Sequence, residues 1–226
     1  MEIKDVELAT IQKNKLFQGI TKEHIPEALH ILNAVHKQYE KNEIIFCVGD
    51  KFQYAGMVLD GAVELSFSDE NFNQINMNHF FTGQMFGESL ACANIQHSPV
   101  QMMALVKSRI LFFNFEKLLS RSVDSNLLVE QLRVNLLHDF ARQNVFLNRK
   151  VRILGQKKLR DKIKVYLRGL EKKEDGTMKV VFNKSALAEF LGVDRSALSR
   201  ELKRMQDEEI ISVSKDHIQV LDPDFL

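Results

Sequence analysis

Residues 186 to 206 read ALAEFLGVDRSALSRELKRMQ, two short helical patterns that meet at Gly192. Asn183 and Asp194 stand just before the two patterns, and short polar side chains of this type accept hydrogen bonds from the free N–H groups of a first helical turn. Gly192 has no Cβ and therefore tolerates the sharp turn that must separate two such helices. The stretch predicts two capped helices joined by a tight turn.

The second of these helices is predicted to have one buried and one exposed face. Leu198, Leu202 and Met205 recur at four- and three-residue steps and form a single apolar stripe. Polar side chains gather on the other side, near the helix N-terminus: Arg195, Ser196, Ser199 and Arg200. This layout is typical of a helix-turn-helix, whose second helix enters the major groove of DNA with its N-terminal residues against the base edges.

Arginine suits a base-reading position because its planar guanidinium can donate two hydrogen bonds to O6 and N7 of guanine. Lys184, Lys203 and Arg204 are better placed to contact phosphates, which position a protein on DNA without reading its sequence. A helical hairpin with a solvated basic face is the alternative. Because the caps, the glycine, the small residue Ala188 and the leucine stripe agree with one another, DNA binding is the preferred interpretation.

The charge of the chain is distributed unevenly. Its net charge is +1, yet residues 150–226 carry 17 Lys or Arg against 13 Asp or Glu, whereas residues 1–149 carry 14 against 17. Residues 149–173 alone hold 11 basic residues and two acidic ones. This asymmetry favours a polyanion as the partner of the C-terminal part.

Composition is ordinary for a soluble protein, with 27% charged and 45% hydrophobic residues. Cys47 and Cys92 form no Cys-x-x-Cys pair, so they predict neither a zinc site nor an iron–sulfur cluster, and they indicate a reducing compartment. The sequence contains no apolar signal region and no apolar run of membrane-spanning length. We expect a cytoplasmic, bacterial-type protein with no membrane partner.

Residues 43–116 have the character of a β-domain, whereas residues 5–40 carry helical spacing, for example at Ile25, Leu29, Leu32 and Val35. The β-domain contains six short runs rich in β-branched and aromatic residues: EIIFCV, YAGMVL, AVELSF, INMNHFF, VQMMALV and ILFFNF. Turn signals separate these runs: Gly49-Asp50, Asp60-Gly61, Asp69-Glu70-Asn71, Gly83-Gln84 and Ser98-Pro99. The pattern predicts an antiparallel sandwich or barrel.

Residues 116–154 contain neither proline nor glycine. Apolar residues recur there at three- and four-residue steps, with an interruption near Gln143: Val129, Leu132, Leu136, Phe140, Leu147, Val151 and Leu154. So long a stripe suits a helix that packs against a partner helix, which predicts the seam of a homodimer. A helix that covers its own β-domain is the alternative, and one helix can do both.

After Gly155, the stretch LRDKIKVYLRGL predicts an amphipathic helix with Leu159, Ile163, Tyr166, Leu167 and Leu170 on its buried side. Glu174-Asp175-Gly176 predicts a turn, and MKVVF a short strand. The last stretch, EIISVSKDHIQVLD, predicts two short strands around Lys215-Asp216, which form a hairpin or wing.

Over nearly its whole length the chain resembles the cAMP receptor protein/fumarate–nitrate regulator (Crp/Fnr) superfamily of bacterial transcription factors. The resemblance is carried by the turns Gly49-Asp50 and Asp60-Gly61, by GQMFGES, by the long helix, and by ALAEFLGVDRSALSRELKRM with its wing. It implies an α+β fold with an N-terminal β-roll, a jelly roll like that of cyclic-nucleotide-binding domains, at residues 1–118. It further implies a dimerisation helix at residues 119–154 and a C-terminal winged helix-turn-helix at residues 155–226.

By position, the resemblance implies that Arg195, Ser196 and Arg200 read bases, with Ser199 beside them, and that a homodimer binds the two half-sites of a palindrome in double-stranded DNA. Family members often have glutamate where this chain has Ser196. We therefore expect a half-site that departs from the best-known consensus. If the regulator is an activator, RNA polymerase is a further expected partner.

The resemblance also implies an effector pocket in the β-roll, with these candidate residues: Phe86, Gly87, Glu88, Ser89, Ser98 and Gln101. Nucleotide-binding members hold the ribose with a Gly-Glu pair, present here as Gly87-Glu88, and the cyclic phosphate with a later Arg-Ser or Arg-Thr pair. Ser98-Pro99 occupies the later position here, so a phosphate diester would be buried without a guanidinium partner. We expect a small effector other than cAMP. Glu88 either meets that ligand or caps the short helix after Gly87.

Other cofactors and other functions find less support. The N-terminal cysteine cluster of the oxygen-sensing branch is absent, and lone histidines such as His79 and His97 are more often structural, so neither an iron–sulfur cluster nor haem is expected. The sequence has no Gly-rich phosphate loop, His-Glu-x-x-His helix or Gly-x-Ser-x-Gly elbow, which argues against an enzyme. The remaining alternative is a nucleotide-sensing module whose C-terminal helices bind protein rather than DNA.

Overall fold

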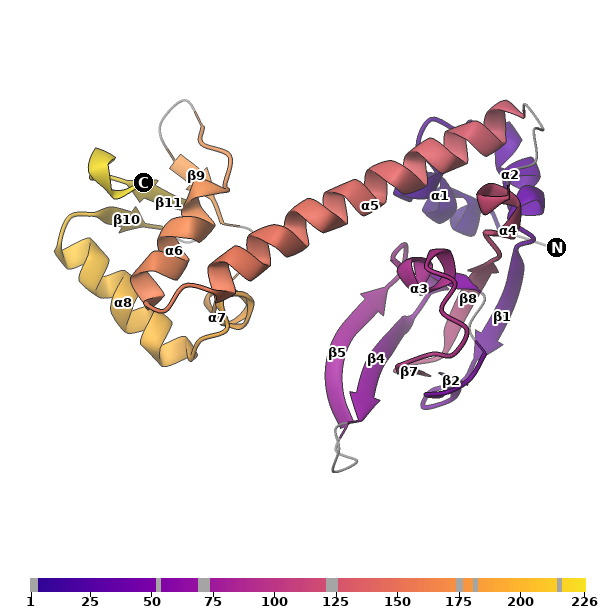
Figure 1. Ribbon diagram of the computed structural model, residues 1–226, viewed down its shortest axis with the longest axis horizontal. Helices are drawn as coiled ribbons and strands as arrows, with labels where there is room; N and C mark the ends of the chain where they lie inside the picture. Colours follow the sequence, from indigo (N-terminus) through magenta and orange to yellow (C-terminus); the bar gives the residue numbers. More distant parts are fainter. Residues whose placement is uncertain are drawn as a thin grey trace. The chain divides into compact units, whose positions relative to one another are not determined.

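The computed structural model describes residues 4–51, 54–68, 74–120, 126–173, 177–180, 183–214 and 217–226. The chain forms two compact units, Met1–Phe140 and Ala141–Leu226, which are called unit 1 and unit 2 below. Figure 1 labels the helices and strands of both units. The turns predicted at residues 69–71, 174–176 and 215–216 lie outside the described residues.

Unit 1 contains two four-stranded sheets, and each of the six strand-like runs in the sequence contributes to one of them. The first sheet has the order β1-β8-β3-β6, with β1 at Val35–Tyr39, β8 at Ser108–Phe113, β3 at Ala55–Asp60 and β6 at Met85–Phe86. The second has the order β2-β7-β4-β5, with β2 at Ile44–Phe46, β7 at Gln101–Ala104, β4 at Ala62–Ser68 and β5 at Gln74–Phe81. The strand pairs are antiparallel, which confirms the predicted β-domain.

Both sheets contribute side chains to an aromatic core. Phe86 is only 1% exposed, and its ring centroid lies 5.7 Å from that of Phe80 and 6.3 Å from that of Phe112. Gly56 makes room for this ring, because a Cβ at that position would lie 2.2 Å from Cζ of Phe86. A glycine within strand β3 is therefore explained by the close approach of its backbone to an aromatic side chain.

Helices pack on unit 1 and build a second core. These helices are α1 (Asp5–Lys13), α2 (Ile25–Ile31) and the short turns Lys15–Phe17 and Lys22–His24. Helix α3 (Glu88–Cys92) lies between β6 and β7 in the sequence, and α4 (Glu116–Leu119) follows β8. These helices bury apolar residues against those of β3 and β8: Ile11, Phe17, Ile25, Leu29, Leu32, Met57, Leu111 and Phe113. Residues 55–59 of β3 are all buried, because side chains on both of its faces enter a core.

The helical prediction for residues 5–40 is wrong at its C-terminal end. Helix α2 stops at Ile31, Asn33 adopts a positive φ of 45°, and Val35 begins strand β1. Val35 is 52% exposed, so it does not continue the buried face of the helix. Asparagine tolerates left-handed backbone better than most residues, which ends the helix before the apolar spacing does.

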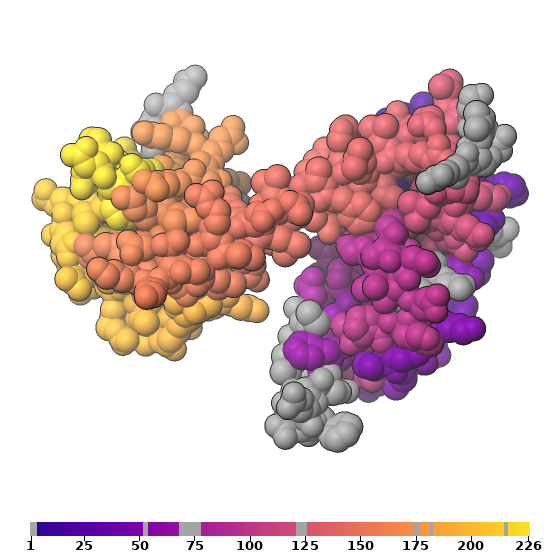
Figure 2. All heavy atoms as spheres, in the orientation of Figure 1, coloured from indigo at the N-terminus to yellow at the C-terminus, as the bar shows by residue number. Residues whose placement is uncertain are grey.

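The long helix α5 spans Leu127–Leu154 and begins later than the predicted run from residue 116. Its first turns carry the apolar residues that pack on the core of unit 1: Val129, Leu132, Leu136 and Phe140. The helix thus covers its own β-domain, as the alternative interpretation had it. The rest of the predicted stripe is exposed, with Leu147 at 57%, Val151 at 67% and Leu154 at 44%. Atoms of α5 lie at the surface in Figure 2.

Unit 2 combines helices α6 (Leu159–Arg168), α7 (Lys184–Leu191) and α8 (Arg195–Asp207) with a three-stranded sheet. The sheet has the order β10-β11-β9, with β10 at Ile211–Val213, β11 at His217–Val220 and β9 at Thr177–Lys179, and a short turn follows at Pro223–Phe225. The predicted stripe of α8 is buried in this core, since Leu198, Leu202 and Met205 are at most 3% exposed. The paired strands β10 and β11 are the predicted wing.

A buried ion pair joins α1 to the first sheet of unit 1. An Nη1 atom of Arg109 lies 2.7 Å from Oε1 of Glu7, and the two side chains are 19% and 6% exposed. The second carboxylate oxygen of Glu7 accepts a hydrogen bond from the backbone N–H of Lys4. Burial makes this pair sensitive to the loss of either partner, because the remaining charge would lie in the interior without compensation.

Arg109→Met is therefore expected to lower the free energy of unfolding of unit 1 by about 3 kcal/mol. Lys107→Met is the matched control, because its pair with Glu40 is exposed at 62% and 67% and should contribute less than about 1 kcal/mol. Urea unfolding followed by circular dichroism measures both. Equal effects of the two substitutions would contradict the assignment.

Candidate nucleic-acid interface and sensor segment

The turn between α7 and α8 has the geometry that the sequence predicts. Gly192 adopts φ 62° and ψ 49°, in the left-handed region, and a Cβ there would lie 2.8 Å from Cδ2 of Leu154. Oδ1 of Asn183 accepts a hydrogen bond from the backbone N–H of Ala186. Oδ1 of Asp194 accepts from the N–H groups of Ser196 and Ala197 at 2.9 and 3.0 Å. Both predicted caps are thus formed, and they fix where each helix begins.

The predicted DNA-contacting side chains lie on the surface of α7 and α8. Exposed residues among them are Lys184, Arg195, Ser196, Arg200 and Lys203, while Ser199 is half-buried. On α8, Ser196, Arg200 and Lys203 lie on the side away from the leucine stripe, so the buried face and the polar face of this helix are separate. The arrangement leaves the N-terminal turns of α8 free to approach another molecule.

Three polar residues at the start of α8 are linked to one another. The hydroxyl of Ser196 donates to Oδ1 of Asp194 at 2.5 Å and accepts from Nη1 of Arg200 at 3.1 Å. The hydrogen bond from Ser196 is the main cause that lowers the pKa of Asp194 below its usual value. Ser196 therefore orients the guanidinium of Arg200, whose other N–H groups can still meet a ligand.

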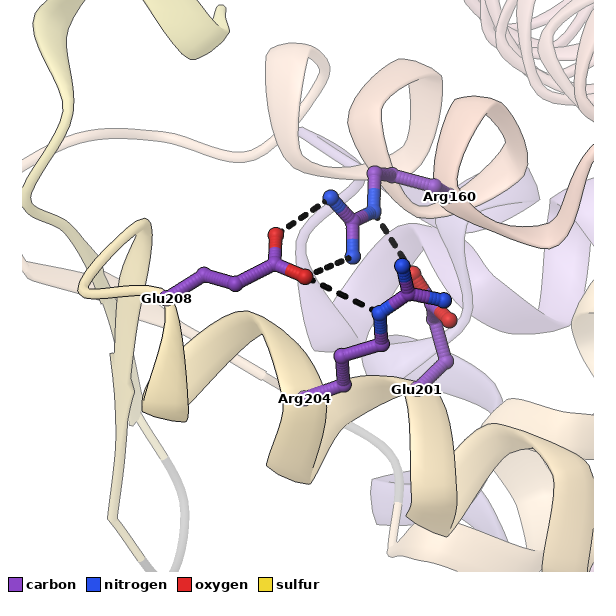
Figure 3. Close-up of polar contacts among 4 residues, drawn as sticks. All are labelled: Arg160, Glu201, Arg204 and Glu208. Carbon is purple, nitrogen blue, oxygen red and sulfur yellow. Dashed lines mark hydrogen bonds and ion pairs between the residues drawn. The ribbon is translucent and has the colours of Figure 1, made fainter.

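An ion-pair network attaches α8 to α6, as Figure 3 shows. Nε of Arg160 donates to Glu201 at 2.6 Å, and its two Nη atoms donate to Glu208 at 2.6 and 3.2 Å. Arg204 also donates to Glu208, at 2.9 Å. The hydrogen bonds to Glu208 and then Glu201 raise the pKa of Arg160, and the bond from Arg160 is the main cause that lowers the pKa of Glu208.

This network was not predicted from the sequence. The spacing of Arg204 and Glu208 on one helix indicates an intrahelical pair. Arg160 lies 41 residues before Glu201 in the chain, so no local pattern identifies it as a partner. The network also engages Arg204, one of the residues expected to contact phosphates, although its side chain is still 70% exposed.

Arg160→Met is expected to destabilise unit 2 by about 1–2 kcal/mol, because Glu201 and Glu208 lose a charged hydrogen-bond partner. Arg168→Met is the matched control, since it removes the same charge from an exposed position of the same helix. Thermal unfolding followed by circular dichroism measures both variants. A loss of the same size for Arg168→Met would mean that general charge, not the network, is responsible.

The candidate effector residues lie on several elements of unit 1. Phe86 ends β6 and is buried, Gly87 has a left-handed φ of 74° before α3, and Glu88 is the first residue of α3. Ser89 is exposed on α3, while Gln101 lies on β7 opposite Ser66 of β4. The positive φ of Gly87 accounts for the glycine at this position.

Ser98 is 2% exposed and is part of a turn. Its hydroxyl donates to the carbonyl of Val100 at 2.6 Å and accepts from the N–H of Val100 at 3.2 Å. Its backbone pairs with Gly49 and Asp50 at 2.8 Å each. The Ser98 side chain is therefore hydrogen-bonded inside the protein. In the nucleotide-binding pattern, by contrast, the side chains at this place face an anion.

The cysteine and histidine candidates have structural surroundings. Burial, with a smaller contribution from Glu88, raises the pKa of Cys92 to about 11, so the thiol stays protonated near neutral pH. A ring nitrogen of His79 lies 2.9 Å from the carboxylate of Glu64, and Nδ1 of His97 donates to the carbonyl of Gly49 at 2.8 Å. Among the described residues, no group of three or more His, Cys, Asp and Glu is placed to hold a metal ion.

Of the helices within the described ranges, none is both long and apolar enough to cross a membrane.

Comparisons with protein families match both parts of the chain. Residues 36–121 match the cyclic nucleotide-binding domain, and residues 163–226 match the Crp-like helix-turn-helix domain. No curated protein sequence matches the chain.

Solved structures of the same fold cover nearly all of it. A putative cyclic nucleotide binding protein from Ruegeria pomeroyi has 20% sequence identity and a TM-score of 0.53, over 98% of this chain and 95% of that one. The catabolite activator protein of Thermus thermophilus has 19% identity and a TM-score of 0.53, over 92% and 93%. DNR from Pseudomonas aeruginosa has 20% identity and a TM-score of 0.50, over 99% and 97%.

Proposed function

The chain belongs to the Crp/Fnr family of DNA-binding transcription regulators, which are not enzymes, and we propose that it acts in the bacterial cytoplasm as a homodimer on a palindromic site, under the control of a small effector other than cAMP. The observation that carries the specific DNA contacts is the exposed polar face of α8. There, Arg200 is oriented by Ser196, and Asp194 caps the helix. As an activator, the protein would also contact RNA polymerase.

Helix α5 supports the homodimer. It carries a row of exposed apolar residues: Leu127, Val134, Leu137, Ala141 and Val145. Successive members of the row are seven, three, four and four residues apart. Leu137 is 66% exposed and Val145 is 70% exposed, which is costly for side chains of this size unless another surface covers them. This row is not the stripe that the sequence pattern emphasised, whose first four residues pack on unit 1. A second copy of α5 is the natural cover for such a row.

A two-fold symmetric dimer implies a symmetric operator. Each copy presents one α8 helix, and two such helices in successive major grooves read half-sites about 34–36 Å apart. The two half-sites are then inverted repeats, because the symmetry of the protein is transferred to its DNA. Effector binding in unit 1 would change DNA affinity through α5, to which both units contribute residues.

The exclusion of cAMP rests on unit 1. Ser98-Pro99 replaces the Arg-Ser or Arg-Thr pair of nucleotide-binding members, and the Ser98 hydroxyl is already engaged with Val100. A cyclic phosphate at this place would lack its guanidinium partner, and the charge would be poorly compensated. Calorimetry with cAMP and the purified protein should therefore detect no binding.

Leu137→Glu is expected to convert the dimer to a monomer, because it places a charge in the apolar seam of α5. Leu147→Glu is the control, since Leu147 is similarly exposed, at 57%, but lies outside the row of residues at positions 127, 134, 137, 141 and 145. Size-exclusion chromatography with light scattering gives the mass of each variant. A wild-type chain that is monomeric at micromolar concentration would refute the dimer.

Arg200→Ala is expected to weaken binding to the preferred operator by about 1–3 kcal/mol and to relax base preference at one position of each half-site. Lys203→Ala should instead weaken binding to all sequences alike. It should also reduce the magnitude of the slope of log K against log[salt] by about one. An operator selected from random duplexes, followed by anisotropy titrations at several salt concentrations, provides the measurement. Binding that ignores both salt and Arg200 would favour a module that binds protein.

A further inference from the structure

A cleft of about 480 Å³ in unit 1 is separate from the residues at positions 86–89. It is bordered by β1, β2, β8 and the residues at positions 50, 51 and 54, and its principal lining residues are Lys37, Tyr39, Phe46, Lys51, Tyr54 and Phe112. Its volume falls within the range of about 300–1,000 Å³ that is usual for sites of small ligands. The cleft is large enough for one ring system with a polar substituent.

The wall of the cleft is aromatic. Tyr39 is 8% exposed, and its ring centroid lies 6.4 Å from that of Phe112 in an edge-to-face arrangement. Tyr54 and Val35, which also line the cleft, are by contrast 44% and 52% exposed. Apolar and aromatic surface that faces water around a concavity favours an apolar or aromatic ligand.

Two lysines give the cleft a positive charge. Nζ of Lys37 lies 5.9 Å from the ring centroid of Phe112, and Lys51 lines the same cleft. Within the described ranges, neither lysine lies within ion-pair distance of a carboxylate, whereas Lys107 pairs with Glu40 at 2.6 Å. The acidic lining residue Asp50 accepts a hydrogen bond from the backbone of Cys47 at 2.7 Å. Its negative charge disfavours a dianion more than a monoanion.

We propose that this cleft binds a small aromatic carboxylate, with the ring against the wall of Phe112 and Tyr54 and the carboxylate beside Lys37 and Lys51. A monoanion matches two lysines and one aspartate, and a flat ring matches the aromatic wall. Lysine suits a carboxylate here as a point charge, without the two-pronged geometry that arginine would impose.

The cleft is also placed to act as the effector site, a role that rests on the proposed function. Phe112 contacts Phe86 edge-to-face at 6.3 Å, and Phe86 directly precedes Gly87 and Glu88. A ligand that packs against Phe112 therefore reaches, through one aromatic contact, the segment where related proteins hold their effectors. Coupling through packed side chains with alternative arrangements is a known route between sites.

Binding is tested on the full chain by ligand-observed fluorine NMR, with 4-fluorobenzoate as the probe and the neutral 4-fluorobenzamide as its match. We expect saturable binding of the benzoate and at least about fivefold weaker binding of the amide, as a charged contact at a partly exposed site allows. Lys37→Met/Lys51→Met should abolish that preference, whereas Lys117→Met, an exposed lysine outside the cleft, should not. Tyr54→Ala should weaken both probes.

The site is refuted if the amide binds as well as the benzoate, if the double lysine variant binds like wild type, or if neither probe shows saturable binding. In the last case a protein partner would be the remaining occupant of the cleft. The control against misfolding is the urea transition of each lysine variant, which should match wild type because all three lysines are exposed.

Titration of DNA keeps this proposal apart from the proposed function. Without probe, the double lysine variant should bind the selected operator like wild type, and Arg200→Ala should still weaken it. Saturating 4-fluorobenzoate should change the operator affinity of wild type and not that of the double variant. Probe binding without any change in DNA affinity overturns the effector role. Failure of the Arg200→Ala effect overturns the proposed DNA contacts while leaving the cleft intact.

Discussion

The recognition helix α8 is immobilised from its apolar side and from its C-terminal end, and the candidate DNA contacts depend on that double attachment. Leu198, Leu202 and Met205 are buried in unit 2, which fixes the rotation of the helix about its axis. The bonds from Arg160 to Glu201 and Glu208 fix its position along α6. Because a bidentate contact to guanine requires donors placed within a few tenths of an ångström, such rigidity is a condition for reading bases and not only for stability.

Unit 1 is organised by the need to fill a β-roll. The ring of Phe86 occupies the space above Gly56 and meets Phe80 and Phe112, while Ser98 closes a turn with its own hydroxyl. This aromatic packing fills the interior around Phe86. Phe112 contacts Phe86 in this core and also lines the cleft that contains Lys37 and Lys51. The same side chain thereby connects the core of the roll to its surface.

The elements that could be predicted from the sequence are those whose signal is local. The caps Asn183 and Asp194 and the glycine between them specify the helix pair within a dozen residues. The six β-runs with their turns specify six strands of unit 1, but neither β1 nor β6. The helical prediction fails at Asn33, where the backbone is left-handed. This conformation is a property of a single residue, and the spacing of apolar residues does not encode it. Whether a stripe of α5 faces its own domain or solvent depends on contacts distant in the chain. The partnership of Arg160 with Glu201 is hidden for the same reason.

Ser196 illustrates how one departure from the family pattern changes the logic of the interface. Oδ1 of Asp194, the residue that caps the helix, lies 2.5 Å from Oγ of Ser196. A glutamate in place of Ser196 would therefore put a second carboxylate beside that of Asp194. Like charges so close repel each other, and the added carboxylate would compete for the guanidinium of Arg200. Serine avoids that repulsion, since a neutral hydroxyl donates to Asp194 and accepts from Arg200 at once. Because its donor is then already used, we propose that base recognition rests on Arg195 and Arg200, and that Ser196 orients the second of these arginines.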